Sequence, residues 1–356
     1  MSGLLPDPSV ENATAAALSR FGSHLPAGAT ATVAADAGLI NGTWLVSGPD
    51  GGPLAVLQWL NPLFSPLIHH DIAALLARLA DHGLEAPRLL PTDAGALWAE
   101  AERGAWRLWS FVPGSTLHTV GSAAVAAEAG ALVGRFHRAM DGWRPARHAP
   151  LRQIHDTPLR MQELAEALAS RPDHPLAAEA GALGAQLLAD WAAWAGALEE
   201  PEVVGHGDLK ISNLRFDEAG EAARCLLDLD TIGPIGLSAE LGDAWRSWCN
   251  PSGEDSVDDV NFDLSRFEAS ATAFLEQGPP LSAARRAALA HAPERICLEL
   301  AGRFCRDAVL NSYFREDRAR FPEQGAHNLH RARVQAQLAR SAKARSPALL
   351  RVLRPA

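Results

Sequence analysis

Lysine is nearly absent from this chain of 356 residues, in which Lys210 and Lys343 are the only two. The positive charge is therefore almost entirely arginine, and no lysine lies before residue 210. The formal net charge at neutral pH is -10. This acidic balance argues against nucleic acid as the main partner of the protein.

Signals for secretion, for membrane insertion and for paired cysteines are also lacking. The N-terminus has no basic region followed by an apolar one, and no run approaches the roughly 18 apolar residues of a membrane span. The four cysteines show no CxxC spacing and are typical of buried thiols. Apolar residues make up 47% of the chain, which is enough for a full core. We expect a cytoplasmic protein of about two domains that has no membrane partner.

The first 112 residues predict a small antiparallel sheet accompanied by helices. Asn-Gly and Asp-Gly pairs between apolar runs are typical of hairpin turns, and helical spacing that stops at a glycine indicates a helix end. The expected helices span residues 9–22 and 69–82, and the expected strands span residues 30–35, 43–47, 53–60, 96–100 and 106–112.

From residue 113 onward the pattern is mainly helical. The expected helices span residues 122–140, 175–198, 241–248, 263–276, 282–290, 295–314 and 328–342. The sequence therefore predicts an α+β fold with two lobes. A sheet-based N-lobe would comprise residues 1–112, and a larger C-lobe would comprise residues 113–356.

Residues 203–230 carry the groups that phosphoryl transfer requires. They form an apolar run, a polar loop, and two short strands joined by a turn, and the second strand leads into Asp228. Phosphoryl transfer needs a carboxylate near the acceptor hydroxyl, and an amide and a second carboxylate on the metal that holds the nucleotide phosphates. We expect Asp208 to be the catalytic base, and Asn213 and Asp228 to bind Mg²⁺.

Four other polar residues have expected supporting roles. Lys210, two residues after Asp208, would offset charge on the transferring phosphate, although a solvated lysine is the alternative. His206 is expected to brace the loop. Asp230 is either a further acid on the metal side or a structural partner. Asp243 opens a helix, where an acid is favoured by the helix dipole, and is expected to be structural.

Several segments resemble a known family. HGDLKISNLRFD and LLDLDT resemble the catalytic and metal-binding segments of the protein-kinase-like small-molecule phosphotransferases, the aminoglycoside/choline-kinase-like superfamily. Other segments resemble the N-acetylhexosamine 1-kinase group within it; these are LVSGPDGGPLAVLQWLN, WRLWSFV, IHDTPLR, GDAWRSWCN and the tail LELAGRFCRDAVLNSYF with HNLHRARVQAQL. The resemblance implies a two-lobed kinase-like fold, and transfer of the γ-phosphate of Mg-ATP to the anomeric hydroxyl of an N-acetylhexosamine or related sugar.

The resemblance also implies roles for individual residues. Asp243 would anchor the backbone of the catalytic loop, which is the polar loop that contains His206, Asp208, Lys210 and Asn213. Backbone groups near Leu108 and Ser110, between the lobes, would bind the adenine of the nucleotide. Six residues would line or buttress the acceptor site, with simple structural pairing as the alternative for each: His155, Asp156, Arg160, Arg246, Asn250 and Arg303. The departures at residues 309–312 and at Trp59 leave the identity of the sugar open.

The nucleotide side of the N-lobe departs from the kinase pattern. The third strand has Gln58 at the position closest to that of the phosphate-pairing lysine, and Gln58 carries no charge. Either an arginine or Lys210 supplies that charge, or the site binds ATP with less of it. Asp71 is the candidate for the helix acid that would pair with such a lysine. Residues 36–42 contain only two glycines and favour a plain hairpin over a phosphate-binding loop.

Other acceptors and a non-catalytic role remain open at this point. The acceptor is alternatively an aminoglycoside, a choline-like amino alcohol or homoserine. A polycationic acceptor would favour an acidic pocket, for which Glu254, Asp255, Asp258 and Asp259 are candidates. The missing N-lobe lysine allows a pseudokinase that holds nucleotide without turnover.

Overall fold

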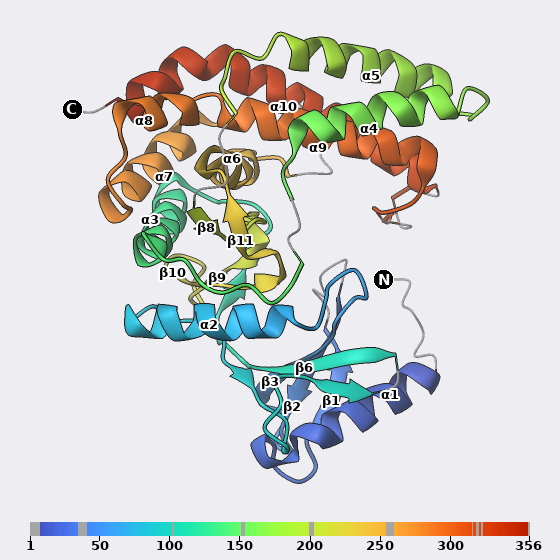
Figure 1. Cartoon of the computed structure of the whole chain (residues 1–356), viewed down its shortest axis with the longest axis vertical. Coiled ribbons are helices and arrows are strands. Elements are labelled where there is room, and N and C mark those ends of the chain that lie inside the picture. Colours follow the sequence, from blue (N-terminus) through green and yellow to red (C-terminus); the bar gives the residue numbers. More distant parts are fainter. Residues whose placement is uncertain are drawn as a thin grey trace. The chain divides into compact units, whose positions relative to one another are not determined.

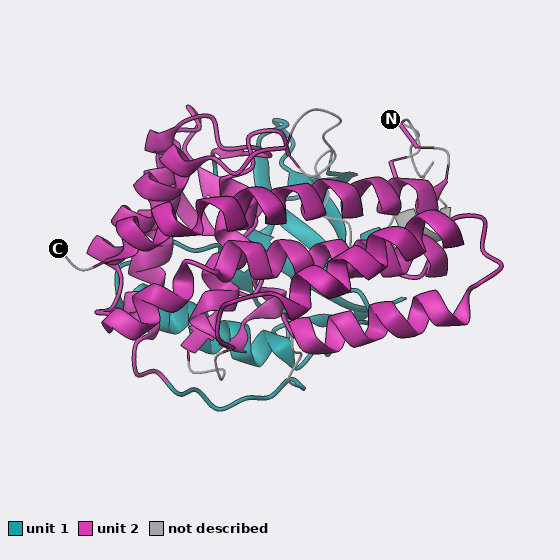
Figure 2. Cartoon of the chain, turned by 90° about the horizontal axis from the view of Figure 1, so that it is seen from above, with its two compact units in different colours: residues 1–113, 144–151 teal, residues 114–143, 152–356 magenta. Residues whose placement is uncertain are grey.

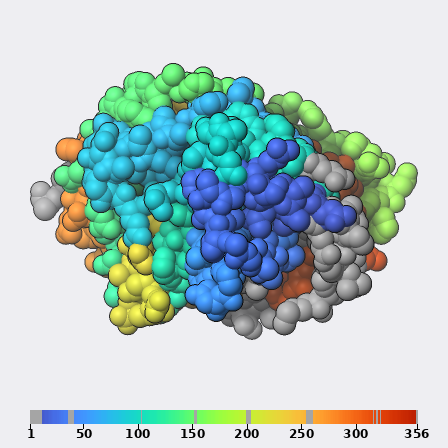
Figure 3. Space-filling view, turned by 90° about the horizontal axis from the view of Figure 1, so that it is seen from below, coloured from blue at the N-terminus to red at the C-terminus, as the bar shows by residue number. Residues whose placement is uncertain are grey.

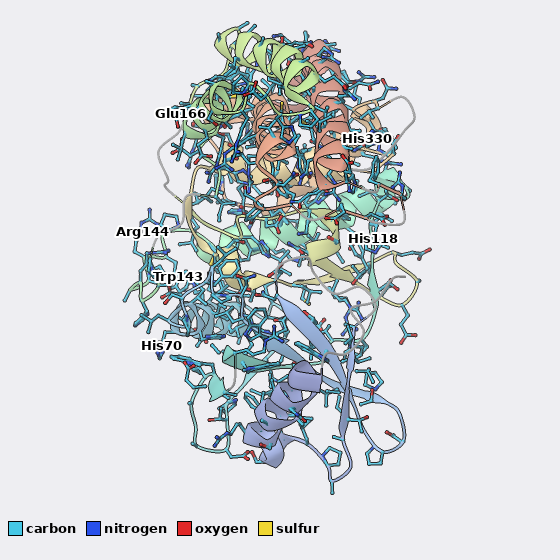
Figure 4. All side chains as sticks on the ribbon, turned by 90° about the vertical axis from the view of Figure 1, so that its right-hand side faces the viewer. His70, His118, Trp143, Arg144, Glu166 and His330 are labelled. Atoms are coloured by element: carbon cyan, nitrogen blue, oxygen red, sulfur yellow. The ribbon has the colours of Figure 1, made fainter. Side chains whose placement is uncertain are left out.

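The computed structural model describes residues 8–34, 41–101, 103–150, 154–198, 203–253, 260–314, 316–317, 320–321 and 323–354. The chain forms two compact units, shown in teal and magenta in Figure 2. The first comprises residues 1–113 and 144–151, and the second comprises residues 114–143 and 152–356. The chain returns to the first unit after Trp143, at Arg144; both residues are labelled in Figure 4.

The first unit is built on an antiparallel sheet. Its strands follow the order β1-β2-β3-β6-β4, and β5 pairs with β6. They are β1 (Thr30–Val33), β2 (Gly42–Ser47), β3 (Pro53–Trp59), β4 (Leu89–Leu90), β5 (Ala99–Ala101) and β6 (Gly104–Ser110). The expected hairpin between β1 and β2 is present, although residues 36–40 of its turn lie outside the described residues.

One face of this sheet is apolar and is covered by α1 (Pro8–Leu18). Alternation along β2, β3 and β6 places a row of large apolar side chains on that face, where they pack against α1 and the 3-10 helix Ser19–His24. These side chains include Trp44, Val46, Leu57, Trp106 and Leu108. Figure 3 shows α1 at the surface of the unit. The residues in between, which include Gln58 and Arg107, therefore belong to the opposite face.

Helix α2 (Ile68–Asp81) holds the segment that returns from the second unit. The Asp71 carboxylate accepts hydrogen bonds from the backbone N–H groups of His148 (2.8 Å) and Ala149 (3.1 Å), and Nδ1 of His148 lies 2.9 Å from it. The sequence named Asp71 only as a candidate partner of a phosphate-binding cation. In the structure, its carboxylate holds His148 and Ala149 of the segment that returns to the first unit.

The second unit is mainly helical, with two small sheets of order β10-β9-β7 and β11-β8. Its helices are α3 (Ala123–Met140), α4 (Thr157–Ser170), α5 (Ala177–Ala192), α6 (Leu237–Trp248), α7 (Leu264–Gln277), α8 (Ala283–Leu289), α9 (Ala292–Leu310) and α10 (Gln324–Leu353). Its strands are β7 (Ser115–Thr116), β8 (Val203–Gly205), β9 (Leu214–Phe216), β10 (Ala223–Leu226) and β11 (Gly233–Ile235). Figure 1 shows α10 beside α9, and α4 and α5 also pack against α9.

The prediction of an α+β fold, with an antiparallel N-terminal sheet followed by a mainly helical region, is confirmed. Helix α4 was not predicted as a helix; it begins after Asp156, whose carboxylate accepts the N–H of Leu159. Within the described parts of the chain, none of the helices has both the length and the apolar character needed to cross a membrane.

Two helical glycines provide a matched test of how α3 packs against α7. A Cβ on Gly130 in α3 would lie 2.1 Å from the carbonyl oxygen of Ser270, whereas a Cβ on Gly181 in α5 would meet nothing within 4 Å. We expect Gly130→Ala to lower the free energy of unfolding by about 1–3 kcal/mol, and Gly181→Ala to raise it by about 0.5–1 kcal/mol. Urea unfolding of both variants measures this, and equal effects would contradict the close approach.

Candidate active site

The β9–β10 hairpin brings the polar loop next to Asp228. The backbone N–H of Leu227 donates to the carbonyl oxygen of Asn213 at 2.7 Å, and Nε2 of His206 lies 2.7 Å from the carbonyl oxygen of Leu227. Since a carbonyl only accepts, Nε2 of His206 carries the proton, and Nδ1 accepts the N–H of Asp208 at 3.3 Å. His206 therefore joins the catalytic loop to the strand that leads to Asp228.

Asp208 is fixed by two neighbours on its own loop. Its Oδ2 lies 3.0 Å from Nζ of Lys210 and accepts a hydrogen bond of 2.9 Å from Nδ2 of Asn213. Burial raises the pKa of this carboxyl, but the charge and hydrogen bond of Lys210 outweigh burial and lower the pKa to about 2. Asp208 is therefore an ionised carboxylate at neutral pH, with a defined orientation.

Asn213 and Asp228 suit a magnesium ion that arrives with a nucleotide. Both hydrogen bonds of the Asn213 amide use Nδ2, toward Asp208 O and Oδ2, so this orientation turns Oδ1 away from Asp208. Asp228 has φ 57° and ψ 62°, a left-handed conformation that is costly for a residue with a side chain and is common at functional sites. Among the described residues there is no cluster of three or more His, Cys, Asp or Glu able to hold a metal. Mg²⁺ needs only one or two protein carboxylates when phosphates and water complete its shell.

Glu240, rather than Asp243, anchors the start of the catalytic loop. The fully buried Glu240 carboxylate accepts the backbone N–H groups of His206 at 2.7 Å and of Gly207 at 2.9 Å. Burial opposes its ionisation, but the imidazole of His137, whose Nε2 lies 3.3 Å from Oε1 of Glu240, and the backbone hydrogen bond from His206 lower the pKa of Glu240 below its ordinary value. The expected anchor, Asp243, lies three residues later on α6 and pairs instead with Arg246, at 2.8 Å.

The same helix holds the rest of the loop. Ser247 Oγ accepts the N–H of Ile211 at 3.0 Å, and the indole of Trp248 donates to the carbonyl oxygen of Leu209 at 2.9 Å. Gly207 has φ 82°, and a Cβ there would lie 2.7 Å from the carbonyl oxygen of Thr231. The segment that follows Asp228, which contains the buried Asp230, thus packs directly on the loop. The close approach explains why glycine precedes Asp208.

Three of the six residues expected at the acceptor site make local structural contacts. Asp156 caps α4 through the N–H of Leu159, and Arg160 pairs with Glu163 one turn later at 3.1 Å. The Asn250 side chain donates to the carbonyl oxygen of Gly253 and accepts the N–H of Ser252. These contacts support structural roles for Asp156, Arg160 and Asn250.

His155 and Asp243 belong to a buried polar cluster. Nδ1 of His155 lies 2.9 Å from Oε1 of Glu299, and the hydroxyl of Thr157 donates to Oε2 of Glu299 at 2.6 Å. Burial lowers the pKa of His155, but Glu299 outweighs burial and raises it above its ordinary value, with a further contribution from Asp243. Nε2 of His155 and Oδ2 of Asp243 are buried and make no hydrogen bond within the described part of the chain.

Arg303 lies beside two aromatic side chains that the sequence did not single out. Its guanidinium carbon is 5.9 Å from the ring centroid of Tyr313 and 5.5 Å from that of Phe314. The carboxylate of Asp307 holds this turn by accepting the N–H groups of Ser312 at 2.7 Å and of Phe314 at 2.8 Å. Residues 311–314 therefore form a defined turn that presents Tyr313, which is 41% exposed, beside Arg303.

The three residues predicted to bind nucleotide lie in the first unit. Leu108 is in the middle of β6, paired with both β3 and β4, and its side chain is in the core. The N–H of Ser110 donates to the carbonyl oxygen of Arg88 at 2.8 Å. The backbone of Leu108 and the N–H of Ser110 are thus engaged in the sheet, and adenine binding by backbone groups near them stays a prediction. Gln58 bonds to Arg107 and Trp109.

The acidic cluster proposed for a polycationic acceptor, Glu254, Asp255, Asp258 and Asp259, lies outside the described residues, as does most of the 36–42 turn.

The fold and the catalytic loop together define the class of this protein. A model of the phosphotransferase enzyme family matches residues 32–277. Because this match covers more than half of the chain, the protein belongs to that family, and it is a phosphotransferase.

Solved structures of related fold extend over nearly the whole chain. An aminoglycoside phosphotransferase from Alicyclobacillus acidocaldarius is 14% identical with a TM-score of 0.62, and the match covers 99% of this chain and 97% of that one. A microcompartment-associated aminopropanol kinase is 16% identical with a TM-score of 0.60, covering 92% and 96%. The amicoumacin kinase hAmiN, solved in complex with AMP-PNP, Ca²⁺ and Ami, is 13% identical with a TM-score of 0.56, covering 86% and 89%. These likenesses establish the kinase-like fold.

Replacing the loop anchor tests its importance. In Glu240→Gln an amide takes the place of a charged acceptor for two buried N–H groups, and charge-assisted hydrogen bonds contribute about 1.5–3 kcal/mol. We expect the free energy of unfolding to fall by that amount. We also expect the phosphotransfer rate to fall at least about tenfold, because poorer orientation that raises the activation free energy by about 1.4 kcal/mol has that effect.

The matched control is Glu179→Gln, which removes the exposed partner of Arg333. A surface pair contributes about 0–1 kcal/mol, so this variant should retain wild-type activity. Equal activity of the two variants would contradict the role of Glu240.

Proposed function

We propose that this phosphotransferase moves the γ-phosphate of ATP to the anomeric hydroxyl of an N-acetylhexosamine or a related sugar. The observation that carries the proposal is the fixed, ionised Asp208, held between Lys210 and Asn213 beside Asp228. The AMP-PNP complex of the similarly folded amicoumacin kinase supports a nucleoside triphosphate as the donor.

Asp208 is suited to receive the hydroxyl of the acceptor. A carboxylate with a pKa of about 2 is a weak base, which orients the hydroxyl and accepts its proton late in the transfer. An anomeric hydroxyl is more acidic than an ordinary alcohol because of the ring oxygen, and therefore matches a weak base better. Lys210, whose ammonium lies 3.0 Å from Asp208, is suited to stabilise charge on the transferring group.

Asn213 Oδ1 and the carboxylate of Asp228 would hold Mg²⁺. When bound, the ion would neutralise charge on the nucleotide phosphates. Asn213 also donates to Asp208, so the same side chain couples the acceptor-orienting carboxylate to the metal position. The left-handed backbone of Asp228 fixes the direction in which its side chain leaves the hairpin.

The buried polar cluster supports a neutral, hydroxylated acceptor. His155 Nε2 and Asp243 Oδ2 are buried without a hydrogen-bond partner within the described part of the chain, and a buried polar atom of this kind costs about 1–3 kcal/mol. A hydroxyl group can donate to a carboxylate oxygen, and it can either donate to or accept from an imidazole nitrogen. Tyr313, exposed beside Arg303, offers an aromatic face for a sugar ring.

A cationic acceptor is less well supported by the charges of this cluster, as far as the described residues show. The two buried carboxylates of the cluster, Asp243 and Glu299, are already paired with Arg246 and His155. An ammonium group bound beside Asp243 would be repelled by the guanidinium of Arg246, which already pairs with that carboxylate. We therefore rank an amino alcohol or aminoglycoside below a sugar, although the similarly folded aminopropanol kinase acts, by its name, on an amino alcohol.

An acceptor screen tests the proposal. ADP formation from Mg-ATP is followed with hexosamines, their N-acetyl derivatives, hexoses, aminoglycosides, choline and homoserine. We expect the highest kcat/KM for an N-acetylhexosamine, and phosphorus NMR should show a 1-phosphate. Asp208→Asn should lower kcat by at least about 100-fold, because general-base catalysis contributes about 10²–10⁴. Three results would overturn the proposal: a 6-phosphate product, an amine as the best substrate, or binding of ATP without phosphorylation of any acceptor.

The pH dependence of the rate tests the pairing of Asp208 with Lys210. In Lys210→Met no ammonium opposes the effect of burial, so the pKa of Asp208 rises and its ionised fraction at acidic pH falls. We expect the acid limb of kcat/KM to move to higher pH in Lys210→Met. Lys210→Arg keeps the charge and serves as the control, with an acid limb close to that of the wild type. Coincident acid limbs in all three proteins would show that Lys210 does not set this pKa.

A further inference from the structure

A buried histidine at the end of α3 lies beside the carboxylate that anchors the catalytic loop. Nε2 of His137 is 3.3 Å from Oε1 of Glu240, and the two side chains are 1% and 0% exposed. Nε2 of His137 is itself buried, and it makes no hydrogen bond to any other group in the described part of the chain. His137 and Glu240 therefore form a buried pair that joins α3 to α6.

Aromatic rings and backbone enclose this pair. The ring of His137 packs edge-on against Phe136 on α3 and Phe274 on α7, and its centroid lies 5.3 Å and 5.8 Å from theirs. The backbone of Gly205 comes so close that a Cβ there would lie 2.8 Å from Cδ of Glu240. In such surroundings the charge of the carboxylate has to be offset by protein groups, because bulk water does not reach it.

The other histidine beside Glu240 is neutral. Nε2 of His206 donates to the carbonyl oxygen of Leu227, and Nδ1 accepts the N–H of Asp208. A ring that donates from one nitrogen and accepts at the other carries no charge. Glu240 lies in the first turn of α6, where the helix dipole also favours an acid. His137 is thus the side chain that adds to this dipole as a donor or a cation.

We infer that His137 is a positioning residue for phosphoryl transfer: its imidazole N–H keeps Glu240 ionised, and Glu240 fixes the catalytic loop. The inference rests on the proposed use of that loop. An ionised carboxylate offers both oxygens as acceptors, as the N–H groups of His206 and Gly207 require. Protonation would turn one oxygen into a donor, so one N–H would lose its partner and the backbone before Asp208 would loosen.

Removing the imidazole tests the inference on the loop itself. In His137→Leu burial still raises the pKa of Glu240 and the imidazole no longer opposes burial, so this pKa rises. We expect the amide hydrogens of His206 and Gly207 to exchange at least about 10-fold faster, because removing one partner of a buried pair is strongly destabilising. NMR of the full chain measures this exchange without any acceptor.

A double-mutant cycle with Glu240→Gln is the decisive measurement. A neutral amide at position 240 needs no compensating charge, so in that background His137→Leu should change the exchange of the two amides less than about twofold. With Mg-ATP and the best acceptor of the screen, kcat should fall about 10-fold on His137→Leu in the wild type, and less than about twofold in Glu240→Gln. Equal effects of His137→Leu in the two backgrounds would overturn the inference, because they would show that His137 only packs.

Leu132→Ala is the matched control for packing. Leu132 is a buried apolar residue of α3, five positions before His137 and hence about 7.5 Å away along the helix axis. Its truncation leaves a cavity beside the same helix without removing a polar group. Its effects on amide exchange and on kcat should therefore be the same with glutamate or glutamine at position 240. A coupling as large as that of His137→Leu would contradict the role of the imidazole.

Two further variants keep the inference testable if His137→Leu does not fold. His137→Phe keeps a ring against Phe136 and Phe274 but has no N–H, so it should show the same coupling to Glu240→Gln. His137→Gln can place an N–H donor near the position of Nε2. We expect the two loop amides to exchange at least about threefold more slowly in His137→Gln than in His137→Phe, as for one recovered hydrogen bond. No recovery would overturn the inference.

The outcomes distinguish this inference from the proposed function. If no acceptor in the screen is phosphorylated, the proposed function fails, whereas the exchange of the His206 and Gly207 amides still shows whether His137 holds the loop. If an N-acetylhexosamine is phosphorylated but the cycle is additive in both exchange and kcat, the assignment of His137 alone is overturned.

Discussion

The catalytic loop depends on one buried carboxylate. Glu240, in the first turn of α6, receives the N–H groups of two consecutive residues, His206 and Gly207, immediately before Asp208. A buried N–H without a partner is costly, so these two bonds determine the path of the backbone at this point. The side chain of His206 then holds the carbonyl oxygen of Leu227, next to Asp228. Asp208 and Asp228, the two carboxylates proposed to serve the acceptor and the metal, are thereby connected to a single helix through backbone groups.

The candidate catalytic residues were predictable because their chemistry is local in the sequence. Asp208 and Asn213 are five residues apart on one loop, and a short hairpin brings Asp228 beside them. Residue type, spacing and the apolar strand before Asp228 were sufficient to select them. The hydrogen-bonding pattern of the hairpin, and the left-handed backbone at Asp228, became visible only in the structure.

The anchor of the loop and the partner of Gln58 could not be identified in the same way, because each depends on tertiary geometry. Glu240 acts on a residue 34 positions away, and the sequence offers a second acid, Asp243, one turn later on the same helix. Helical periodicity places both acids near one face without showing which one meets the loop. Arg107 is 49 positions from Gln58, and only the register of β3 against β6 makes them neighbours. A register shifted by one residue would have turned Arg107 toward α1.

The scarcity of lysine acquires a structural meaning from these contacts. One of the two lysines lies on the catalytic loop, 3.0 Å from Asp208, where a compact ammonium lowers the pKa of a carboxylate. On the first unit, the neutral amide of Gln58 on β3 accepts a hydrogen bond from Arg107 on β6, the neighbouring strand in the sheet. An amide oxygen orients the guanidinium through a hydrogen bond and adds no charge of its own. The two units therefore place different cations beside their polar groups, a lysine ammonium on the loop and an arginine guanidinium on the sheet.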